Sequence, residues 1–458
     1  MPSASVPPPA ADVLTADTSR DPDTALRIFS WIVVVFALLQ IVTFSFGRDQ
    51  SIYAVVGSGM LDGQMPYRDL WDFKPPGIFF VYAASFAVFG HSMIAPRLVE
   101  ALCAFAVVLG CRRLGGTIFE SRTAGLLGGA LATLLHAELE FWHTGQPETF
   151  AGALTIAALV VTTHAWSRKR EVFAWLGVGA LAGLAFLLKP PLGGLALPCA
   201  LYLAFQRRKD GRSFAAQLAP LGVMTLGSLV PIVLTLGWFA ARGALPDLRW
   251  TLSEFAPGYT RLSWVGQNPI SLYTYGVFEA FFKLSALVGA GFVLLIFFER
   301  RVRTSRPGIV LIVSVVLVQL AGVALQGKFF QYHYAASLPL LACLAGVGFH
   351  RLWRRFCVDS TLAAFAFALL LVALAVLRLP VRDVPHGFWA RSATRLHYLL
   401  GAGRSITREE LDRDLYYVAD YNLDADRKLA GELRRSLPQH APIYVWGFEP
   451  LVYWQGEF

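Results

Sequence analysis

Residues 48–77 of the chain read RDQSIYAVVGSGMLDGQMPYRDLWDFKPPG. An apolar run ends just before this stretch and another begins directly after it, which predicts that the stretch lies at the surface of a membrane. Carboxylates, a lysine and several aromatic rings are therefore expected beside lipid. Because ionisable groups in such a position cost free energy, they indicate a functional site.

The composition of the whole chain agrees with a membrane location. Its 458 residues are 55% hydrophobic and only 16% charged, and the mean hydropathy is +0.52, which is more apolar than a soluble domain. We predict eleven membrane-spanning helices, near residues 25–46, 94–111, 123–142, 149–166, 173–188, 191–205, 217–239, 277–298, 308–325, 331–349 and 360–378. The predicted fold class is an all-α polytopic membrane protein with a small α/β extramembrane segment at the C-terminal end.

Basic side chains between the predicted spans indicate which side of the membrane each loop faces. Arg and Lys collect in cytoplasmic loops, and here they collect in alternate connections, at residues 112–122, 168–170, 207–212, 300–306 and 351–355. The N-terminus is then cytoplasmic and residues 48–77 are exported. We predict a multi-pass protein of the bacterial inner membrane, with its active site and C-terminus on the periplasmic or extracellular side. The net charge of +9 reflects this topology, and we expect no binding of nucleic acid.

Two apolar segments are ambiguous, and the charge pattern decides how they are interpreted. Residues 78–90 are too short to span the membrane, so we expect them to lie in the interface or to re-enter. Residues 173–205 are long enough for one helix, but Lys189-Pro190-Pro191 interrupts them, and we predict two short spans. Any other assignment would place the later basic loops on the exported side.

The chain divides into three predicted regions. Residues 1–24 are polar and rich in proline, which is typical of a disordered cytoplasmic tail. Residues 25–379 form the transmembrane domain, with an exported loop at 47–93. Residues 380–458 form an exported C-terminal region, in which we predict a helix around 409–437 and a strand at 442–446.

This topology brings most of the unusual polar residues to one face of the membrane, although they are far apart in sequence. They are Asp49, Asp62, Asp69, Asp72 and Lys74 in the first exported loop, Glu138, Glu140, His143 and Glu148 in the second, Lys189 in the third, Asp247, Arg249, Glu254 and Arg261 in the fourth, and Lys328 and His333 in the fifth.

Asp49 and two Lys-Pro-Pro segments suggest the chemistry of this face. Asp49 follows the first span closely, so its carboxylate is fixed by a helix and still reaches solvent, as a general base must. The other interpretation is a solvated acid beside a helix. Lys74 precedes Pro75-Pro76, which fixes an ammonium group at headgroup depth for a lipid phosphate; the alternative is an ordinary snorkelling lysine. Lys189 repeats this arrangement, unless it only marks a helix break.

The order of motifs resembles the GT-C integral-membrane glycosyltransferases, in particular the protein O-mannosyltransferases and the aminoarabinose transferases. The motifs are Asp49, then Gly63-Gln64-x-Pro66-Tyr67-x-Asp69, Lys74-Pro75-Pro76-Gly77, Phe89-Gly90 and Ala95-Pro96-Arg97-Leu98, with a later patch at Lys328-x-x-x-Tyr332-His333-x-x-x-x-x-Pro339. The resemblance covers residues 45–100 and this later patch. It implies a sugar donor linked to polyprenyl phosphate, an exported active site and inversion at the anomeric carbon.

The resemblance also implies roles for individual residues. Asp49 is the catalytic base, and Glu148 is a second catalytic carboxylate. The donor phosphate is bound by Lys74, Lys189, Lys328 and Tyr332. Substrate contacts are assigned to Tyr53, Tyr67, Asp69, Arg97, His143 and His333. Two of these residues keep another interpretation, since Glu148 can stabilise a helix N-terminus and His333 can be an interfacial histidine.

Two departures from the family pattern leave a divalent metal open. Many relatives have an acid directly after the first one, where this chain has Gln50, and the residue before Lys74 is Phe73 in place of an acid. No other cofactor is implied, and the chain has no nucleotide-binding motif.

The sequence therefore predicts a hexosyl or pentosyl transferase that uses a polyprenyl-phosphate sugar, with a lipid, glycan or protein acceptor. A secondary transporter or lipid flippase is the alternative, because such proteins are also polytopic with broken helices. A non-catalytic assembly subunit with the same fold is a third interpretation.

Overall fold

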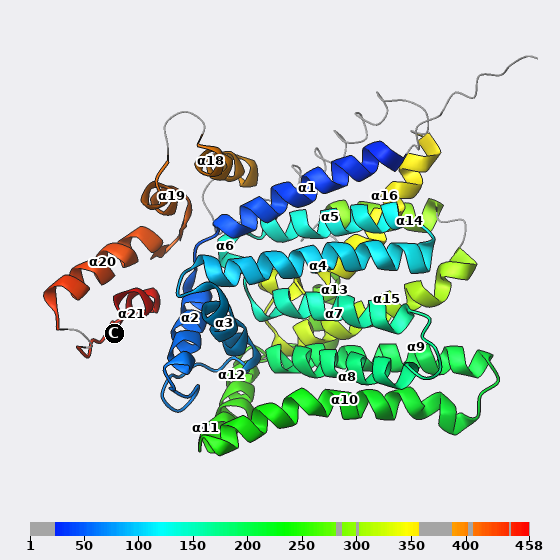
Figure 1. Ribbon diagram of the computed structural model, residues 1–458, viewed down its shortest axis with the longest axis horizontal. Coiled ribbons are helices and arrows are strands. Elements are labelled where there is room, and N and C mark those ends of the chain that lie inside the picture. The colour runs from blue at the N-terminus through cyan, green and yellow to red at the C-terminus, as the bar shows by residue number, and fades with distance from the viewer. Residues whose placement is uncertain are drawn as a thin grey trace, which may run out of the picture.

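The computed structural model describes residues 23–280, 286–298, 302–356, 387–401, 406–438 and 441–457. Long helices run side by side through most of the molecule (Figure 1). They are α1 (Asp23–Thr43), α4 (Ile94–Phe119), α5 (Arg122–Glu138), α7 (Pro147–Thr163), α8 (Glu171–Leu188), α9 (Ala196–Lys209), α10 (Phe214–Ala241), α13 (Pro269–Phe278), α14 (Ala286–Phe298), α15 (Val302–Gln326) and α16 (Leu338–Phe356). The predicted all-α polytopic fold class is thus confirmed.

Several of these helices can cross a membrane by length and composition. Within the described residues five qualify, namely α1, α4, α8, α10 and the Ser305–Gln326 part of α15. The helices α7 and α14 are apolar but shorter. The predicted break at Lys189 is confirmed, because α8 ends at Leu188 and the 3-10 helix η1 (Pro190–Leu195) separates it from α9.

Other predicted bounds shift or lie outside the described residues. The predicted span at 331–349 begins too early, since η4 (Gln331–Tyr334) is a short 3-10 helix and α16 starts only at Leu338. The predicted span at 360–378 and the predicted tail at residues 1–22 lie outside the described part of the chain.

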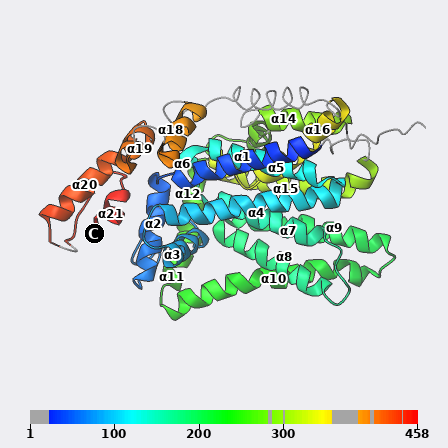
Figure 2. The same ribbon diagram turned by 45° about the horizontal axis from the view of Figure 1, so that its top comes forward.

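The two ends of the helix bundle differ in character. The predicted basic end collects the start of α1 and the ends of α4 and α16, where His350 Nε2 lies 3.1 Å from Asp23 Oδ2 and Arg351 donates to the carbonyl of Phe119. The opposite end carries short helices that run across the long ones, as both views show (Figures 1 and 2). They include α2 (Arg48–Leu61) and α3 (Gly77–Phe89), with α6 (Glu140–His143), α11 (Leu245–Trp250), the π-helix η2 (Thr251–Phe255) and α12 (Ala256–Leu262) at the same end.

The short apolar segment at 78–90 is therefore a crossing helix. Its helix α3 packs beside α2 and follows directly from Pro75-Pro76, so its axis differs from that of the spanning helices (Figure 1). This placement agrees with the predicted interfacial position of the segment.

The C-terminal region differs from its prediction. The single helix predicted at 409–437 is wrong, because α19 (Arg408–Leu415) and α20 (Leu423–Ser436) are separated by a hairpin of β1 (Tyr417–Val418) and β2 (Tyr421–Asn422). The aromatic rings at the hairpin explain the interruption: Tyr416 and Tyr421 are buried and donate to the carbonyls of Thr43 and Phe46. The strand predicted at 442–446 is also wrong, since the described residues offer it no pairing partner. Helices α18 (Phe388–Leu400) and α21 (Leu451–Gly456) complete the region.

Buried ion pairs fix this region to the end of the bundle that carries the short crossing helices. Arg395 Nη1 lies 3.0 Å from Glu140 Oε1, and Arg391 Nε lies 3.1 Å from Glu140 Oε2. All of these side chains are almost completely buried. Arg48, at the start of α2, also pairs with Asp420 at 2.9 Å and with Glu449 at 2.6 Å.

Asp426, an acid near Arg48, makes the stability of this attachment depend on pH. Burial, together with the charge of Glu449, raises the pKa of Asp426 from 3.8 to about 7, although Arg48 opposes the rise. Because folding raises the pKa of Asp426, its protonated form stabilises the folded protein. This stabilisation is lost as pH increases from about 4 to about 7. Docking of the C-terminal region is expected to weaken across this interval.

We predict that Asp426→Asn removes this pH dependence. In the wild type, protease cleavage within residues 401–438 should be faster at pH 8 than at pH 5.5, whereas the variant should show little difference. Glu432→Gln, on the exposed face of α20 where Glu432 pairs with Arg435, is the matched control. An unchanged pH dependence in Asp426→Asn would contradict the assignment.

Candidate active site

A cavity of about 1260 Å³ opens at the end of the bundle that carries the short crossing helices. Its walls come from segments far apart in the chain: α2, the loop at 70–75, the junctions at 142–143 and 189–191, helices η2 and α12, the loop at 325–333, and residues 448–453 of the C-terminal region. Much of the wall is apolar, with Ile52, Val55, Leu252 and Leu325 among its residues. The ionisable groups on it are Arg48, Asp49, Asp72, Lys74, His143, Lys189, Arg261, Lys328 and His333, together with the phenols of Tyr259, Tyr332 and Tyr453.

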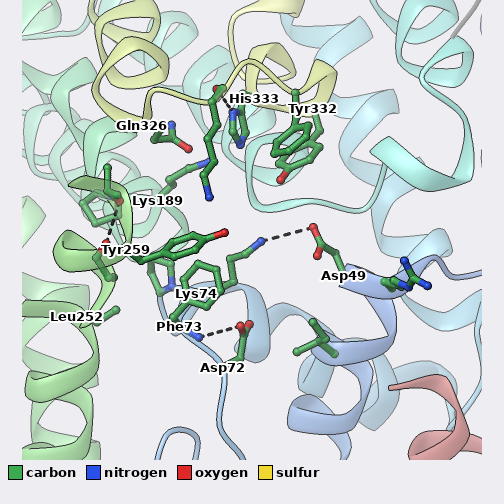
Figure 3. A pocket seen from close by; sticks show the side chains of 18 of the residues that line it. Asp49, Asp72, Phe73, Lys74, Lys189, Leu252, Tyr259, Gln326, Tyr332 and His333 are labelled. Carbon is green, nitrogen blue, oxygen red and sulfur yellow. Dashed lines mark hydrogen bonds and ion pairs between the residues drawn. The ribbon is translucent and has the colours of Figure 1, made fainter. Parts of the chain in front are cut away.

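Asp49 lies in the first turn of α2, at one side of the cavity (Figure 3). Its Oδ2 accepts hydrogen bonds from the Lys74 ammonium at 3.5 Å and from the Gln146 amide at 3.2 Å. The helix start is fixed because Gln50 accepts a hydrogen bond from the Gly47 amide and donates to the carbonyl of Phe141. The carboxylate is therefore held in place while about a quarter of its side chain remains exposed.

Lys74 is positioned by two tyrosines. Its Nζ lies 3.2 Å from the Tyr53 hydroxyl, and the hydroxyl of Tyr67 donates to the Lys74 carbonyl at 2.7 Å. Burial alone would lower the pKa of Lys74, but the charge of Asp49, together with Tyr53, Tyr332 and Asp72, holds the pKa well above its ordinary value. The side chain is thus a permanent cation in the cavity.

The two Lys-Pro-Pro segments lie side by side. A Cβ at Gly77 would come within 2.6 Å of the Leu187 carbonyl group, so the start of α3 packs directly on the backbone at the end of α8. Only glycine permits this approach, which brings the segment at Lys74 against the segment at Lys189. The Lys189 ammonium forms an ion pair with Glu148, and Figure 3 shows its side chain entering the cavity.

The loop at 325–333 completes the cavity on the opposite side. The Lys328 ammonium lies 3.6 Å from the centre of the Tyr259 ring, and the Lys189 ammonium lies 5.9 Å from the centre of the Tyr332 ring. Burial lowers the pKa of His333, and the charges of Lys189, Lys74 and Lys328 lower it further. His333 is therefore neutral, and the lysines from three loops are close enough to act on one imidazole.

The structure brings some of the sequence-predicted residues together and separates others. Asp49, Lys74, Lys189, Lys328, Tyr332, His143 and His333 line the cavity. Tyr53 and Glu148 lie behind its wall and contact Lys74 and Lys189. Tyr67 supports the Lys74 backbone. Asp69 caps the amide of Met65 and pairs with Arg68, so that its carboxylate is used within its own loop.

Arg97 is fully buried and does not line the cavity. Its guanidinium donates to Glu100 at 2.7 Å, to the Thr144 hydroxyl at 3.0 Å and to the carbonyl of Ser45 at 2.7 Å. Glu100 in turn accepts from the Gly145 amide at 2.8 Å. This network fixes the backbone of residues 141–146, and with it Gln146, which contacts Asp49.

Sequence reasoning assigned no role to Gln146, Asp72 or Tyr259. Gln146 is a neutral amide whose place beside Asp49 depends on the fold of the second exported loop. Asp72 carried a usable signal, since it lies two residues before Lys74 in the predicted site loop. For Tyr259 the sequence leaves two interpretations, stacking on a sugar or membership of the aromatic belt of the membrane surface.

The arrangement around Asp49 does not fit a metal ion. Within the described residues, no three His, Cys, Asp or Glu side chains are grouped as metal ligands. The neighbours of Asp49 are instead a lysine and an amide nitrogen, which are donors. We therefore derive no step through a metal.

Comparisons with known proteins give a family match for part of the chain and a shared fold. Residues 73–238 match the model of the family described as dolichyl-phosphate-mannose-protein mannosyltransferase. The matched part includes Lys74, Glu148 and Lys189, whereas Asp49 and Lys328 lie outside it. A search of curated proteins found no significant match.

Solved structures show the same fold. ArnT from Cupriavidus metallidurans bound to undecaprenyl phosphate is 15% identical, with a TM-score of 0.52 over 94% of this chain and 84% of that chain. The apo state of the same protein gives 16% identity over the same shares of the two chains and a TM-score of 0.53. The Archaeoglobus fulgidus oligosaccharyltransferase in complex with Zn and sulfate is more distant, at 14% identity and a TM-score of 0.45 over 93% of this chain and 61% of that one. The predicted resemblance to GT-C membrane glycosyltransferases is confirmed by the family match and by the fold shared with ArnT.

The buried pair of Arg97 and Glu100 leads to a testable energetic prediction. Arg97→Met leaves Glu100 in the interior without its guanidinium partner, and loss of one partner of a buried ion pair costs about 3–5 kcal/mol. The free energy of unfolding of the detergent-solubilised protein should fall by about this amount.

A double-mutant cycle separates the ion pair from packing. Arg97→Met/Glu100→Gln should recover part of the loss, because no unpaired charge remains. Arg113→Met, on the exposed surface of the same helix, should change stability by less than about 1 kcal/mol. Strict additivity of the two single substitutions would show that the pair is not coupled.

Proposed function

We propose that the protein transfers a hexosyl or pentosyl group from a polyprenyl-phosphate donor to an acceptor at the exported face of the membrane, with inversion and with Asp49 as the base. The carrying observation is the cavity itself, which combines one helix-fixed carboxylate with ammonium groups from three loops inside a largely apolar wall. ArnT, which shares the fold, has been captured with undecaprenyl phosphate, and this supports a lipid phosphate as the donor group.

The charges suit the two halves of a displacement reaction. The acceptor hydroxyl or amine attacks the anomeric carbon and transfers its proton to Asp49, while the bond between that carbon and the phosphate oxygen breaks. The bonding electron pair goes to the phosphate. Lys74, Lys328 and the Tyr332 hydroxyl are placed to stabilise the resulting negative charge. Direct displacement inverts the anomeric carbon.

The contact between Lys74 and Asp49 links donor binding to the base. Their separation of 3.5 Å is long for an ion pair, so a phosphate can compete for the ammonium group. When Lys74 bonds to phosphate, Asp49 keeps only the amide of Gln146 as a donor. The carboxylate oxygen that Lys74 leaves can then accept a hydrogen bond from the acceptor group when the donor is in place.

Lys189 differs from the other two lysines because a carboxylate already neutralises it. Glu148 is almost completely buried and pairs tightly with Lys189. We therefore assign Glu148 to holding Lys189 in the wall, with a direct catalytic part for Glu148 as the less favoured assignment. Lys74 and Lys328 carry most of the proposed phosphate binding.

The rest of the molecule has a place in this proposal. In this proposal the basic end of the bundle faces the cytoplasm of a bacterial inner membrane, and helices α18 to α21 form a cap on the exported side. Phe448, Pro450 and Tyr453 of this cap line the cavity, so an acceptor must pass beside them. The proposed acceptor is a lipid, a glycan or a protein.

A transporter or flippase is the second candidate, and the break between α8 and η1 is the observation that favours it. Transport would move the donor lipid without breaking its sugar-phosphate bond. Consumption of the donor therefore separates the two functions.

The role of Asp49 can be tested in proteoliposomes with a panel of radiolabelled undecaprenyl-phosphate hexoses and pentoses and an envelope extract as the acceptor source. Asp49→Asn should lower the turnover number by about 100-fold or more, because general-base catalysis contributes 10²–10⁴-fold. The KM for the donor should change little. Asp62→Asn, at the exposed end of α2, is the matched control, and full activity of folded Asp49→Asn would exclude the proposed base.

Substitution of a phosphate-binding lysine should change the KM for the donor more than the turnover number. Lys328→Ala should raise the KM for the donor by about 10-fold or more, the effect expected for losing a hydrogen bond to a charged group. Lys428→Ala, on the exposed surface of α20, should have no effect. An unchanged KM in Lys328→Ala would remove Lys328 from the phosphate site.

A further inference from the structure

Asp72 is a buried acid in the cavity wall that the proposed reaction does not use. Its side chain is 5% exposed, and it lines the cavity two residues before Lys74. One oxygen, Oδ1, accepts a hydrogen bond from the Phe73 amide at 2.8 Å. The other oxygen, Oδ2, has no hydrogen-bond partner within the described part of the protein.

The loop that carries Asp72 is rigid. The Tyr67 amide donates to the Leu70 carbonyl at 2.8 Å, and Asp69 caps the Met65 amide at 2.7 Å. At the other end the Tyr67 hydroxyl holds the Lys74 carbonyl. The carboxyl group is therefore fixed in place, and Figure 3 shows it turned toward the side of the cavity where Lys74 and Asp49 lie.

Such an oxygen is costly unless a ligand satisfies it. A buried polar group without a partner destabilises the fold. Burial raises the pKa of Asp72 to about 6, and the charge of Lys74 only partly opposes this rise. The Phe73 and Lys74 amides both act on this carboxyl group, yet none of the described residues bonds to Oδ2, which is the difference from Asp69 on the same loop.

Aromatic rings lie directly beside this carboxyl group. Trp71 contacts Phe255 edge-on with ring centres 4.9 Å apart, and Phe73 contacts Tyr259 at 4.9 Å. About half of the Trp71 surface is exposed, and Trp71, Phe73 and Tyr259 all line the cavity. The negative faces of such rings attract the weakly positive C–H face of a sugar, while a carboxylate accepts hydrogen bonds from sugar hydroxyl groups.

We propose that Asp72 is a specificity-determining residue whose Oδ2 accepts a hydrogen bond from a hydroxyl group of the donor sugar, with Trp71, Phe73 and Tyr259 as the wall against which the sugar packs. The inference rests on the proposed function and adds the position of the sugar to it. The phosphate then lies with Lys74 and Lys328, and the sugar extends from the phosphate toward the loop at 70–74. The anomeric carbon is left within reach of the Asp49 side of the cavity.

Binding measurements test this subsite without requiring turnover. The affinities of purified wild type, Asp72→Asn and Asp72→Ala are compared for two probes: undecaprenyl phosphate, and the undecaprenyl-phosphate hexose or pentose that binds the wild type best. Asp72→Ala should weaken binding of the sugar-carrying probe by about 10- to 100-fold. Binding of undecaprenyl phosphate, which has no sugar, should remain within about 2-fold of the wild type. Asp72→Asn keeps an acceptor oxygen, so its affinity for the sugar-carrying probe should lie between those of the wild type and Asp72→Ala.

The control and the contrary outcomes are distinct. Asp62→Asn should bind both probes as the wild type does. Equal weakening of both probes by Asp72→Ala would show that Asp72 only supports the loop, and equal retention of both would show that it contacts no sugar. A probe affinity that falls on chelation of divalent ions in the wild type but not in Asp72→Ala would show a metal ligand, and it would also overturn the inference. If the wild type binds the sugar-carrying probe through Asp72 and yet never consumes it, the proposed transfer fails while the sugar subsite stands.

Discussion

The buried pair of Arg97 and Glu100 is the interaction on which the geometry of the site depends. An ion pair inside a protein is stabilising only when its remaining donors and acceptors are also satisfied. Here the chain satisfies most of them: Arg97 bonds to the Ser45 and Phe141 carbonyls, and Glu100 bonds to the Gly145 amide and to His136. The pair therefore ties the chain just after α1 to the loop at residues 141–146. Gln146, at the end of that loop, then reaches Asp49, and the side-chain amide oxygen of Gln146 accepts from the Tyr53 hydroxyl.

The same constraint explains why this end of the bundle can hold so many charges. Several of the deeply buried ionisable groups meet an opposite charge: Lys189 meets Glu148, and Glu140 meets Arg391 and Arg395. The less buried groups at the cavity are paired more loosely, as the contact of Lys74 with Asp49 shows. Lys328 contacts an aromatic ring in place of a carboxylate. Tight pairs thus build the wall, and loosely paired groups are left to exchange partners with an incoming anion.

The sequence predicted the fold class and the shared face of the site because both follow from local patterns. Hydropathy and the positive-inside rule placed the loops of Asp49, Lys74, Lys189 and Lys328 on one side, and these residues do line one cavity. How deeply each side chain of the motifs is buried was harder to predict. Arg97 and Asp69 share the motif of the cavity residues, yet one is buried behind a loop and the other is used as a cap. Which residue of a motif faces the cavity depends on packing between distant segments. The pattern of a single sequence does not contain this packing information.

The C-terminal region shows the same limit in another form. The charged periodicity of residues 409–437 fits a helix, and α19 and α20 do occupy most of it. The interruption arises because Tyr416 and Tyr421 gain buried hydrogen bonds to the chain between α1 and α2, and this gain exceeds the cost of ending a helix. The carbonyl groups that accept these hydrogen bonds lie more than 370 residues earlier in the chain. The hairpin is thus a product of docking. Because the segment it docks on leads directly into Arg48 and Asp49, the attachment of the cap and the position of the carboxylate are fixed by one stretch of backbone.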